Sequence, residues 1–444
     1  MEEWLWMEAS ALGRQIGSGE IDPVALCDTY LAAIDRHPDA SRIYTRTTPK
    51  RARAEAEAAR IRARNGQRRS ALDGVPVSWK DLFDSAGTAT EAGTALMAGR
   101  VPQQDAEVLR RATAAGLVCL GKTHLSEIAF SGLGLNPITQ TPPHRTDPGA
   151  VPGGSSSGAA ASVAQGLAAA AVGSDTGGSV RIPAAWNDLV GLKTTHGLLP
   201  LTGVVPLAER FDTVGPLTRS VADAALMLGA LGGPAPDLAG ASLKGARFAI
   251  LETIAMGDLE SEPASAFASA CARLEEEGAV FTRIAAPELE DGFALAGPLY
   301  TADAWAEWGP RIEQNPDAMW PPIHERVHAG ADVSASDYLR AWRKLERLRA
   351  RWAERVAGYD AVLCPTAPIR APQVARLLED SAYYVSANLL ALRNTRIGNL
   401  MGGCGVSLPT GVDGCGILLN GLAGQDARLL RVAAAAERVL GPLR

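Results

Sequence analysis

The sequence predicts an α/β protein with a large mixed, mostly parallel sheet covered by helices on both faces. Helix and strand signals alternate along the chain, the strand signals are short buried apolar runs, and 47% of the 444 residues are hydrophobic. An apolar run bounded by turn residues is typical of a strand buried on both faces. Alternation of such runs with helices indicates a layered fold with largely parallel strands.

Turn and cap residues place the elements of the first half. Asp22 followed by Pro23 marks the start of a helix, with aspartate as N-cap and proline in the first turn. Asp105 is expected to cap a later helix in the same way. The predicted helices are 23–36, about 48–65 and 105–115, and the predicted strands are 75–79 and 117–120.

Signals are sparser in the second half, which we expect to belong to the same single domain of residues 1–444. No repeat or clear linker interrupts the chain, and residues 240–355 are expected to form a less typical helical subregion. An apolar stripe on a long, charge-rich helix there predicts a core-facing side. The stripe consists of Leu339, Trp342, Leu345, Leu348 and Trp352. Further strands are expected at 361–364 and 417–419, and a closing helix at Asp426–Leu440.

The stretch from Pro152 to Ile182 organises the rest of the prediction. It contains two glycine-flanked serine clusters, separated by a small-residue helix at Ser157–Gln165 and a buried strand at Leu167–Val172. Glycine lets another group approach the backbone closely, and consecutive amides in such a turn can bind a developing negative charge. A serine in this setting is a candidate nucleophile that needs a base.

Lys80 is a candidate partner for these serines. It directly follows the strand predicted at 75–79, and the turn at 173–179 directly follows another strand. Functional groups in α/β sheets gather at the carboxyl ends of strands, so we expect Lys80 and the turn to meet.

Composition argues against several classes of partner. The net charge is −6, and the chain has no basic block, so nucleic acid is not expected as a partner. The N-terminus lacks the long apolar core of a signal peptide, and the longest apolar run, within 159–173, is shorter than the ~20 residues of a membrane span. We therefore expect a cytoplasmic protein without a membrane partner.

Neither a metal nor another cofactor is expected. The cysteines are scattered without a CxxC pair, which argues against zinc and disulfide frameworks and favours reduced thiols. His324 and His328 have the i, i+4 spacing of metal ligands, but no acidic residue or cysteine stands at motif spacing beside them. The cysteines are Cys27, Cys119, Cys271, Cys364, Cys404 and Cys415.

Two familiar motifs match in letters and fail on structural context. Gly116–Thr123 fits the phosphate-binding P-loop, but its four middle residues are themselves the predicted strand. Gly154–Gly158 fits the GxSxG nucleophile elbow, but two prolines precede it where an apolar strand is required. An elbow with Ser156 as nucleophile and His196 as base remains an alternative.

Three separated motifs, in the same order, resemble the amidase signature family. The central ones are Gly153-Gly-Ser-Ser-Ser-Gly158 and Gly173-Ser-Asp-Thr-Gly-Gly-Ser-Val-Arg-Ile-Pro183. The resemblance covers residues 70–235 and both ends well, and residues 237–355 poorly. It also includes Gly74–Asp81, Gly191–Lys193, Phe211–Pro216, Cys364–Pro368 and Asn399.

The resemblance implies the amidase signature fold and a Ser–Ser–Lys triad that cleaves amides through an acyl-enzyme. It assigns Ser179 as nucleophile, Ser155, after a cis peptide bond, as proton relay, and Lys80 as base. The base must be neutral, and burial would lower its pKa from the usual ~10.4. The implied oxyanion hole is formed by the backbone amides of Thr176, Gly177, Gly178 and Ser179, and the implied supporting residues are Ser156, Asp175 and Arg181.

The expected function is therefore cofactor-free hydrolysis of the carbon–nitrogen bond of a small-molecule amide. Within the family, the alternatives are the glutamine-hydrolysing subunit of a tRNA-dependent amidotransferase and a ureide (biuret-like) hydrolase, which Gly402–Pro409 resembles. A non-catalytic scaffold is a further alternative, and a homodimer is left open. Ser157, Asn187-Asp188 and Thr194 depart from the family pattern, which leaves the substrate open.

Overall fold

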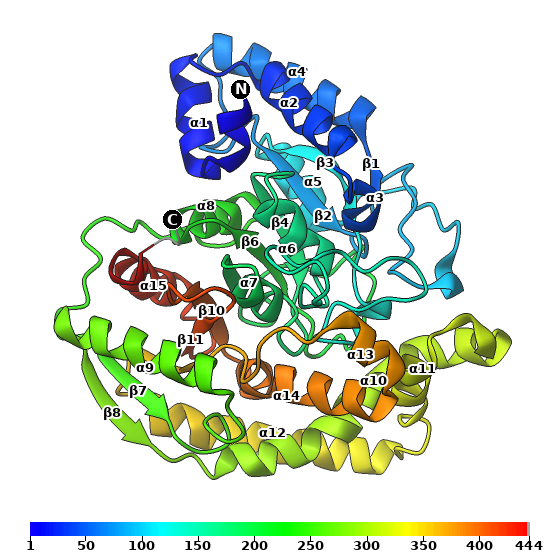
Figure 1. Cartoon of the computed structure of the whole chain (residues 1–444), viewed down its shortest axis with the longest axis vertical. Coiled ribbons are helices and arrows are strands. Elements are labelled where there is room, and N and C mark those ends of the chain that lie inside the picture. Colours follow the sequence, from blue (N-terminus) through cyan, green and yellow to red (C-terminus); the bar gives the residue numbers. More distant parts are fainter. Residues whose placement is uncertain (442–444) are drawn as a thin grey trace.

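A single 11-stranded sheet runs through the molecule (Figure 1). The computed structural model describes residues 1–441. In spatial order the strands are β1 (Tyr44–Thr47), β3 (Val118–Thr123), β2 (Pro76–Lys80), β4 (Ala170–Ser174), β6 (Val214–Thr218), β5 (Val190–Lys193), β10 (Cys404–Pro409), β11 (Gly416–Gly421), β9 (Ala361–Pro365), β7 (Arg247–Leu251) and β8 (Val280–Ile284).

The strand directions confirm a mixed sheet but not a mostly parallel one. β2 is parallel to β3 and β4, and β7 is parallel to β8 and β9. The other six of the ten neighbouring pairs are antiparallel. β10 and β11 are joined by a turn of only a few residues, and such a turn joins antiparallel strands, whereas a parallel pair needs a long crossover. The prediction of a mostly parallel sheet was wrong because apolar runs do not encode direction.

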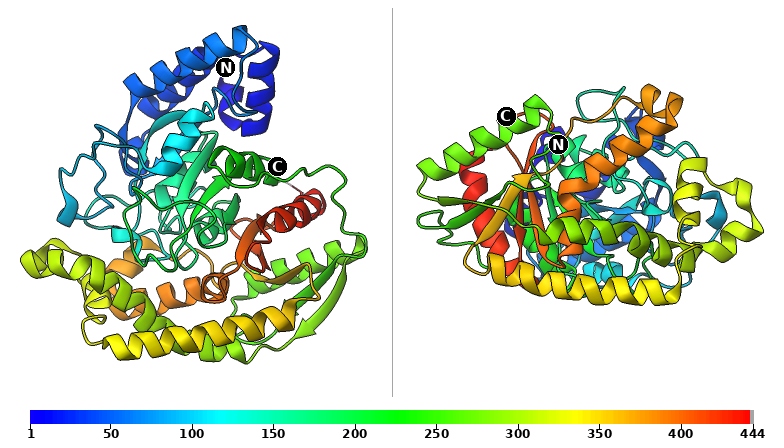
Figure 2. Two further views of the ribbon diagram at one scale, coloured as in Figure 1. Left: turned by 180° about the vertical axis from the view of Figure 1, so that it is seen from behind. Right: turned by 90° about the horizontal axis from the view of Figure 1, so that it is seen from below.

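Helices cover both faces of this sheet (Figures 1 and 2). α6, α7 and α14 form one row against the middle strands, and α8, α15 and α9 form another. The helices are α1 (Ala9–Ser18), α2 (Pro23–Arg36), α3 (Ala40–Ile43), α4 (Pro49–Arg64), α5 (Glu107–Ala114), α6 (Ser157–Ala164), α7 (Arg181–Trp186), α8 (Val221–Ala230), α9 (Ser261–Glu276), α10 (Glu288–Gln314), α11 (Pro321–His328), α12 (Ala335–Val356), α13 (Val374–Glu379), α14 (Ser381–Leu400) and α15 (Asp426–Leu440). Within residues 1–441, none of them has the length and apolar character required to span a bilayer.

Capping predictions were confirmed at one helix and wrong at another. The Asp22 carboxylate accepts hydrogen bonds from the amides of Val24 and Ala25 at the start of α2. The N-cap of α5 is Ala106 instead of Asp105. The Asp105 carboxylate is occupied by the guanidinium of Arg51 from α4, a partner that local sequence does not reveal.

The strand predicted at 167–172 begins later, as β4. The amides of Leu167 and Ala168 donate to the carbonyl of Ser162, so these residues complete the turn after α6. β4 also ends later than predicted, at Ser174, and β2 extends to Lys80. Each of these two strands therefore carries a polar residue at its carboxyl end.

The subregion 240–355 differs from the prediction because it is not only helical. It contributes β7 and β8 to the common sheet, and α10, α11 and α12 pack together beyond it (Figure 1). The Trp308 indole of α10 is fully buried and donates to the Pro206 carbonyl at 3.1 Å. This subregion is therefore packed onto the loop that follows β5.

The predicted apolar stripe of α12 is buried except at one position. Leu345 is fully buried, whereas the side chain of Leu339 is 51% exposed. At that end of the helix Tyr338 faces inward, where its hydroxyl donates to Asp303 of α10 and its ring lies against Trp342. The inner position predicted for Leu339 is therefore filled by its neighbour.

The two leucines give a matched test of this packing. Leu345→Ala should lower the free energy of unfolding by about 2–5 kcal/mol because it leaves a cavity between α10 and α12. Leu339→Ala should change it by less than about 0.5 kcal/mol. Chemical denaturation of both variants measures the difference, and equal losses would contradict the described orientation of α12.

Candidate active site

One of the three predicted triad residues lies on a strand, and the other two lie in the segments before α6 and after β4. Lys80 is the last residue of β2, Ser155 precedes α6, and Ser179 lies between β4 and α7. β2 and β4 are parallel neighbours, paired from Val77 to Trp79. Their carboxyl ends therefore lie side by side, and this brings Lys80 to the serine loops as the sequence predicted.

The Lys80 side chain is fully buried and contacts two serine hydroxyls. Its Nζ lies 2.7 Å from the Ser155 Oγ and 2.8 Å from the Ser174 Oγ. Burial lowers the pKa of the ammonium from 10.5 to about 7, although the carboxylates of Asp175 and Asp212 act in the opposite direction. The amine is therefore neutral in a large fraction of molecules near pH 7.

Two other fully buried lysines show what sets Lys80 apart. Lys122 donates to the Asp81 carboxylate and to the Thr90 hydroxyl, at 2.9 Å each. Lys193 donates to the main-chain carbonyls of Thr194 and Gly403. Carboxylates and carbonyls only accept hydrogen bonds, whereas a hydroxyl can also donate. Among the buried lysines of residues 1–441, Lys80 is thus the one whose hydrogen-bond partners are all hydroxyls, with no carboxylate in direct contact to hold its proton.

The two serine loops are joined through their backbones. The peptide bond between Gly154 and Ser155 is cis. The Ser156 amide donates to the Ser179 carbonyl at 3.1 Å, and the Ser156 hydroxyl donates to the Ser174 carbonyl at 3.2 Å. Ser156 thus connects the two loops. Its hydroxyl is engaged with the Ser174 carbonyl, which argues against Ser156 as the nucleophile.

The hydroxyl of Ser179 faces open space. Its residue is 3% exposed and lines a cavity, while Lys80 and Ser155 are fully buried behind it. Within residues 1–441, the structure contains no hydrogen bond of the Ser179 hydroxyl. Lys80 thus contacts Ser155 directly. Ser179 is linked to the Ser155 loop through its main-chain carbonyl, which accepts from the Ser156 amide.

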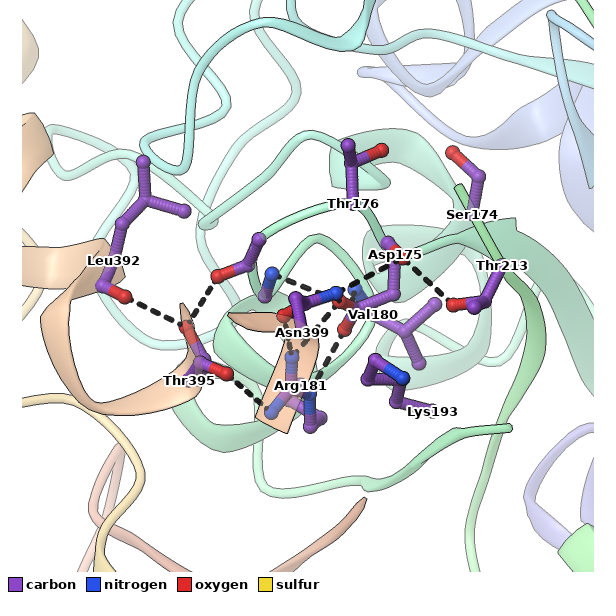
Figure 3. Close-up of polar contacts among 12 residues, drawn as sticks. Ser174, Asp175, Thr176, Val180, Arg181, Lys193, Thr213, Leu392, Thr395 and Asn399 are labelled. Carbon is purple, nitrogen blue, oxygen red and sulfur yellow. Dashed lines mark hydrogen bonds and ion pairs between the residues drawn. The ribbon is translucent and has the colours of Figure 1, made fainter. Parts of the chain in front are cut away.

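An ion pair holds the loop between Ser174 and Arg181 (Figure 3). The Arg181 guanidinium donates twice to the Asp175 carboxylate, at 2.9 Å each, and both residues are fully buried. Burial alone would raise the pKa of the Asp175 carboxyl, but the charge and hydrogen bonds of Arg181 lower it to about 2. From α14, Asn399 accepts from Arg181 at 2.6 Å and donates to Asp175 at 3.0 Å.

One of the four amides predicted for an oxyanion hole is already occupied. The Gly178 amide donates to the Asp175 carboxylate at 2.8 Å. The amides of Thr176, Gly177 and Ser179 have no acceptor within residues 1–441. Only three of the predicted donors are therefore available, because the carboxylate folds back onto its own loop.

Gly178 occupies a position that no other residue can take. Its φ is +140°, and a Cβ there would lie 2.0 Å from the Thr395 Oγ1 of α14. Absence of a side chain lets the loop lie directly against this helix.

The cavity in front of Ser179 is small. The space inside it that a water molecule can occupy is about 20 Å³, little more than one water needs and far below the roughly 300–1,000 Å³ usual for ligand sites. Part of its lining is the predicted loop, with Thr176, Gly177 and Ser179 itself. The other walls, which the sequence did not predict, come from the loops after β3 and β5 and from α10, α11 and α14. They are Ala129, Phe130, Ser131, Leu207, Tyr300, Arg326, Leu392 and Arg396.

Two residues near the triad carried signals that the sequence analysis did not use. Ser174 stands beside Asp175 in the second serine cluster and is the second partner of Lys80. Asp212 belongs to the motif Phe211–Pro216 and accepts from the Thr176 hydroxyl at 2.6 Å. Burial raises the pKa of the Asp212 carboxyl.

The alternative elbow has no matching geometry in residues 1–441. His196 is exposed and its Nε2 lies 2.9 Å from the Glu209 carbonyl, away from Ser156. The segment directly before Gly154 is a loop and not a strand. Likewise, Gly116–Thr123 contains β3 and not a phosphate-binding turn. His324 and His328 stack on α11, and among residues 1–441 no group of three or more metal-ligating side chains converges.

Comparisons with known proteins agree with the geometry of the site. A family model described as Amidase matches residues 25–430. The chain is 35% identical to 2-amino-5-chloromuconic acid deaminase of Comamonas testosteroni, over 95% of this chain and 94% of that one. It is 32% identical to a glutamyl-tRNA(Gln) amidotransferase subunit of Anaeromyxobacter dehalogenans (strain 2CP-C), over 97% and 96%. A crystal structure of an amidase superposes with a TM-score of 0.89 and 30% identity, over 98% and 100%.

The buried ion pair can be tested apart from any activity. Asp175→Asn should lower the free energy of unfolding by about 3–5 kcal/mol, because Arg181 then stays buried without an anion. Asp291→Asn is a matched control, since Asp291 forms a pair with Lys344 at the exposed start of α10, and its denaturation midpoint should hardly change. Similar midpoints for both variants would show that the loop does not depend on this pair.

Proposed function

The chain belongs to the amidase family of amide-cleaving hydrolases, and on that premise we propose that it hydrolyses a small-molecule amide through an acyl-enzyme on Ser179. The observation that supports this most is the Lys80 amine, which is buried, in contact with two hydroxyls and 2.7 Å from the Ser155 Oγ. A neutral amine in that position is a general base.

In the proposed mechanism a proton moves along three side chains. Ser155 gives its hydroxyl proton to Lys80 and takes the proton of Ser179, whose oxygen attacks the carbonyl carbon. The carbonyl oxygen becomes an anion that the amides of Thr176, Gly177 and Ser179 stabilise. The proton on Lys80 returns through Ser155 to the leaving nitrogen, and the carbon–nitrogen bond breaks.

Water completes the reaction by the same route. It gives a proton through Ser155 to Lys80 and its oxygen attacks the acyl carbon. Collapse of this intermediate releases the acid and returns a proton to Ser179. The net reaction consumes one water and yields a carboxylic acid and an amine, with the three side chains regenerated.

Two kinds of relative suggest more specific reactions for the same site. Comparison with the deaminase, at 35% identity, favours removal of an amino group from an unsaturated amino acid. Comparison with the amidotransferase subunits, at 30–32% identity, favours hydrolysis of glutamine in a complex. Turnover by the purified chain alone on aliphatic, aromatic and ureido amides, on glutamine and on 2-aminomuconic acid distinguishes them.

Substitutions in the proposed triad test the mechanism. Ser179→Ala and Lys80→Ala should each lower kcat/KM by more than about 10³-fold, because both remove a part of one proton route. His196→Ala should leave it unchanged. A fluorophosphonate probe should label the peptide containing Ser179 in the wild type and not in Lys80→Ala. Turnover retained in Lys80→Ala and lost in His196→Ala would support the elbow, and absence of any label would support a scaffold.

The pH dependence should follow the neutral fraction of Lys80. Because the pKa of Lys80 is lowered to about 7, kcat/KM for a substrate that does not titrate should rise with pH, reach half its maximum near pH 7 and level off above about pH 8. Initial rates between pH 5 and 9 measure this, with samples returned to pH 8 to exclude unfolding. A rate that is constant or falls between pH 6 and 8 is incompatible with Lys80 as the base.

A further inference from the structure

We propose that Arg326 and Arg396 bind a carboxylate in the cavity in front of Ser179, so that the substrate is a small amide carrying a carboxylate close to the bond that is cleaved. This inference rests on the proposed function of the site and names its substrate class. It is carried by the position of the two guanidinium groups and by the absence of an anionic partner for them among the described residues.

The two arginines reach the cavity from different helices. Arg326 belongs to α11 and Arg396 to α14, and both line the cavity together with Ser179. The Arg396 Nε lies 3.9 Å from the position that a Cβ would take at Gly177. Gly177 carries one of the amides available for the oxyanion, so a positive charge stands directly beside the proposed reaction centre.

Neither arginine has a carboxylate partner in the part of the chain that the structure describes. Within residues 1–441 no Asp or Glu oxygen lies within 4.0 Å of Arg326 or Arg396, in contrast to the buried Arg181 with its Asp175. Arg326 donates, among these residues, only to the Phe130 carbonyl, at 2.8 Å. Burial lowers the pKa of both groups, to about 10 for Arg326, whose pKa the nearby Arg396 lowers further.

An anion would resolve this arrangement. Both side chains are half-buried. Removing a cation from water is costly unless it is paired, and two such cations around one cavity also repel each other. The aromatic contacts of Arg326 with Phe130 and of Arg396 with Tyr300, at 4.1 and 5.7 Å from the ring centroids, offset part of that cost but do not neutralise charge. A guanidinium matches the geometry of a carboxylate through two parallel hydrogen bonds.

Size and charge together define the substrate. The narrow cavity in front of Ser179 favours a small molecule, and the short distance from Arg396 to the Gly177 loop places the carboxylate a few bonds from the amide carbonyl. Monoamides of short dicarboxylic acids have this form. A neutral amide of equal size leaves both arginines unpaired and should be a poorer substrate.

Matched substrates test the inference. Succinamic and glutaramic acids are compared with their neutral methyl esters by kcat/KM, and the wild type should prefer the acids. Arg326→Gln and Arg396→Gln should each reduce that preference about 10- to 100-fold, the range for loss of a charged hydrogen bond. Arg326→Lys keeps the charge without the planar fork and should fall between. Arg340→Gln, an exposed arginine of α12 paired with Asp337, is the control and should keep the preference.

Binding without turnover separates this inference from the proposed mechanism. Succinate and glutarate should raise the melting temperature of Ser179→Ala, and Arg326→Gln in that background should abolish the rise. Binding of these anions by Ser179→Ala, together with a wild type that hydrolyses none of the amides, would leave the inference intact and reject the mechanism. Equal rates on acids and esters, or no thermal shift in Ser179→Ala, would overturn the inference.

Discussion

The arrangement of the candidate active site centres on one buried amine, whose hydrogen-bond partners are hydroxyl groups. Lys80 lies at the end of a central strand, fully buried, with the hydroxyls of Ser155 and Ser174 as its partners. Desolvation makes its neutral form accessible near pH 7, which a solvated lysine would not be. Burial lowers the pKa of Lys122 as well, but its ammonium contacts the Asp81 carboxylate, which acts in the opposite direction.

Keeping that environment requires parts of the chain that are far apart in sequence. β2 and β4 bring Lys80 to the serine loops, and Arg181 fixes the second loop through Asp175. Asn399 of α14 then contacts both members of this pair. Within residues 1–441, the loop held in this way leaves the amides of Thr176, Gly177 and Ser179 without acceptors, while that of Gly178 is occupied. Free amides on one short loop are what a site that stabilises an anion requires.

The floor of the cavity, which contains Ser179, and its walls come from different parts of the chain. The floor is formed by the serine loops, which match the family motifs, whereas Tyr300 and Arg326 come from the subregion that the resemblance covers poorly. Relatives with different named activities share the whole length of the chain. We infer that the floor sets the reaction and that α10, α11 and α14 set which amide is accepted.

The sequence by itself determined the local elements and the residues of the floor. Asp22 caps α2, the closing helix spans Asp426–Leu440 as predicted, and Lys80 meets Ser155. These features could be predicted because helix caps, apolar periodicity and strand ends depend on residues that are close together in the sequence. Tertiary structure alone decided strand direction, the outward position of Leu339, the use of the Gly178 amide by Asp175 and the placement of Arg326 and Arg396 around one cavity. These features arise from contacts between residues distant in the chain or from side chains turning back, for which a local pattern carries no signal.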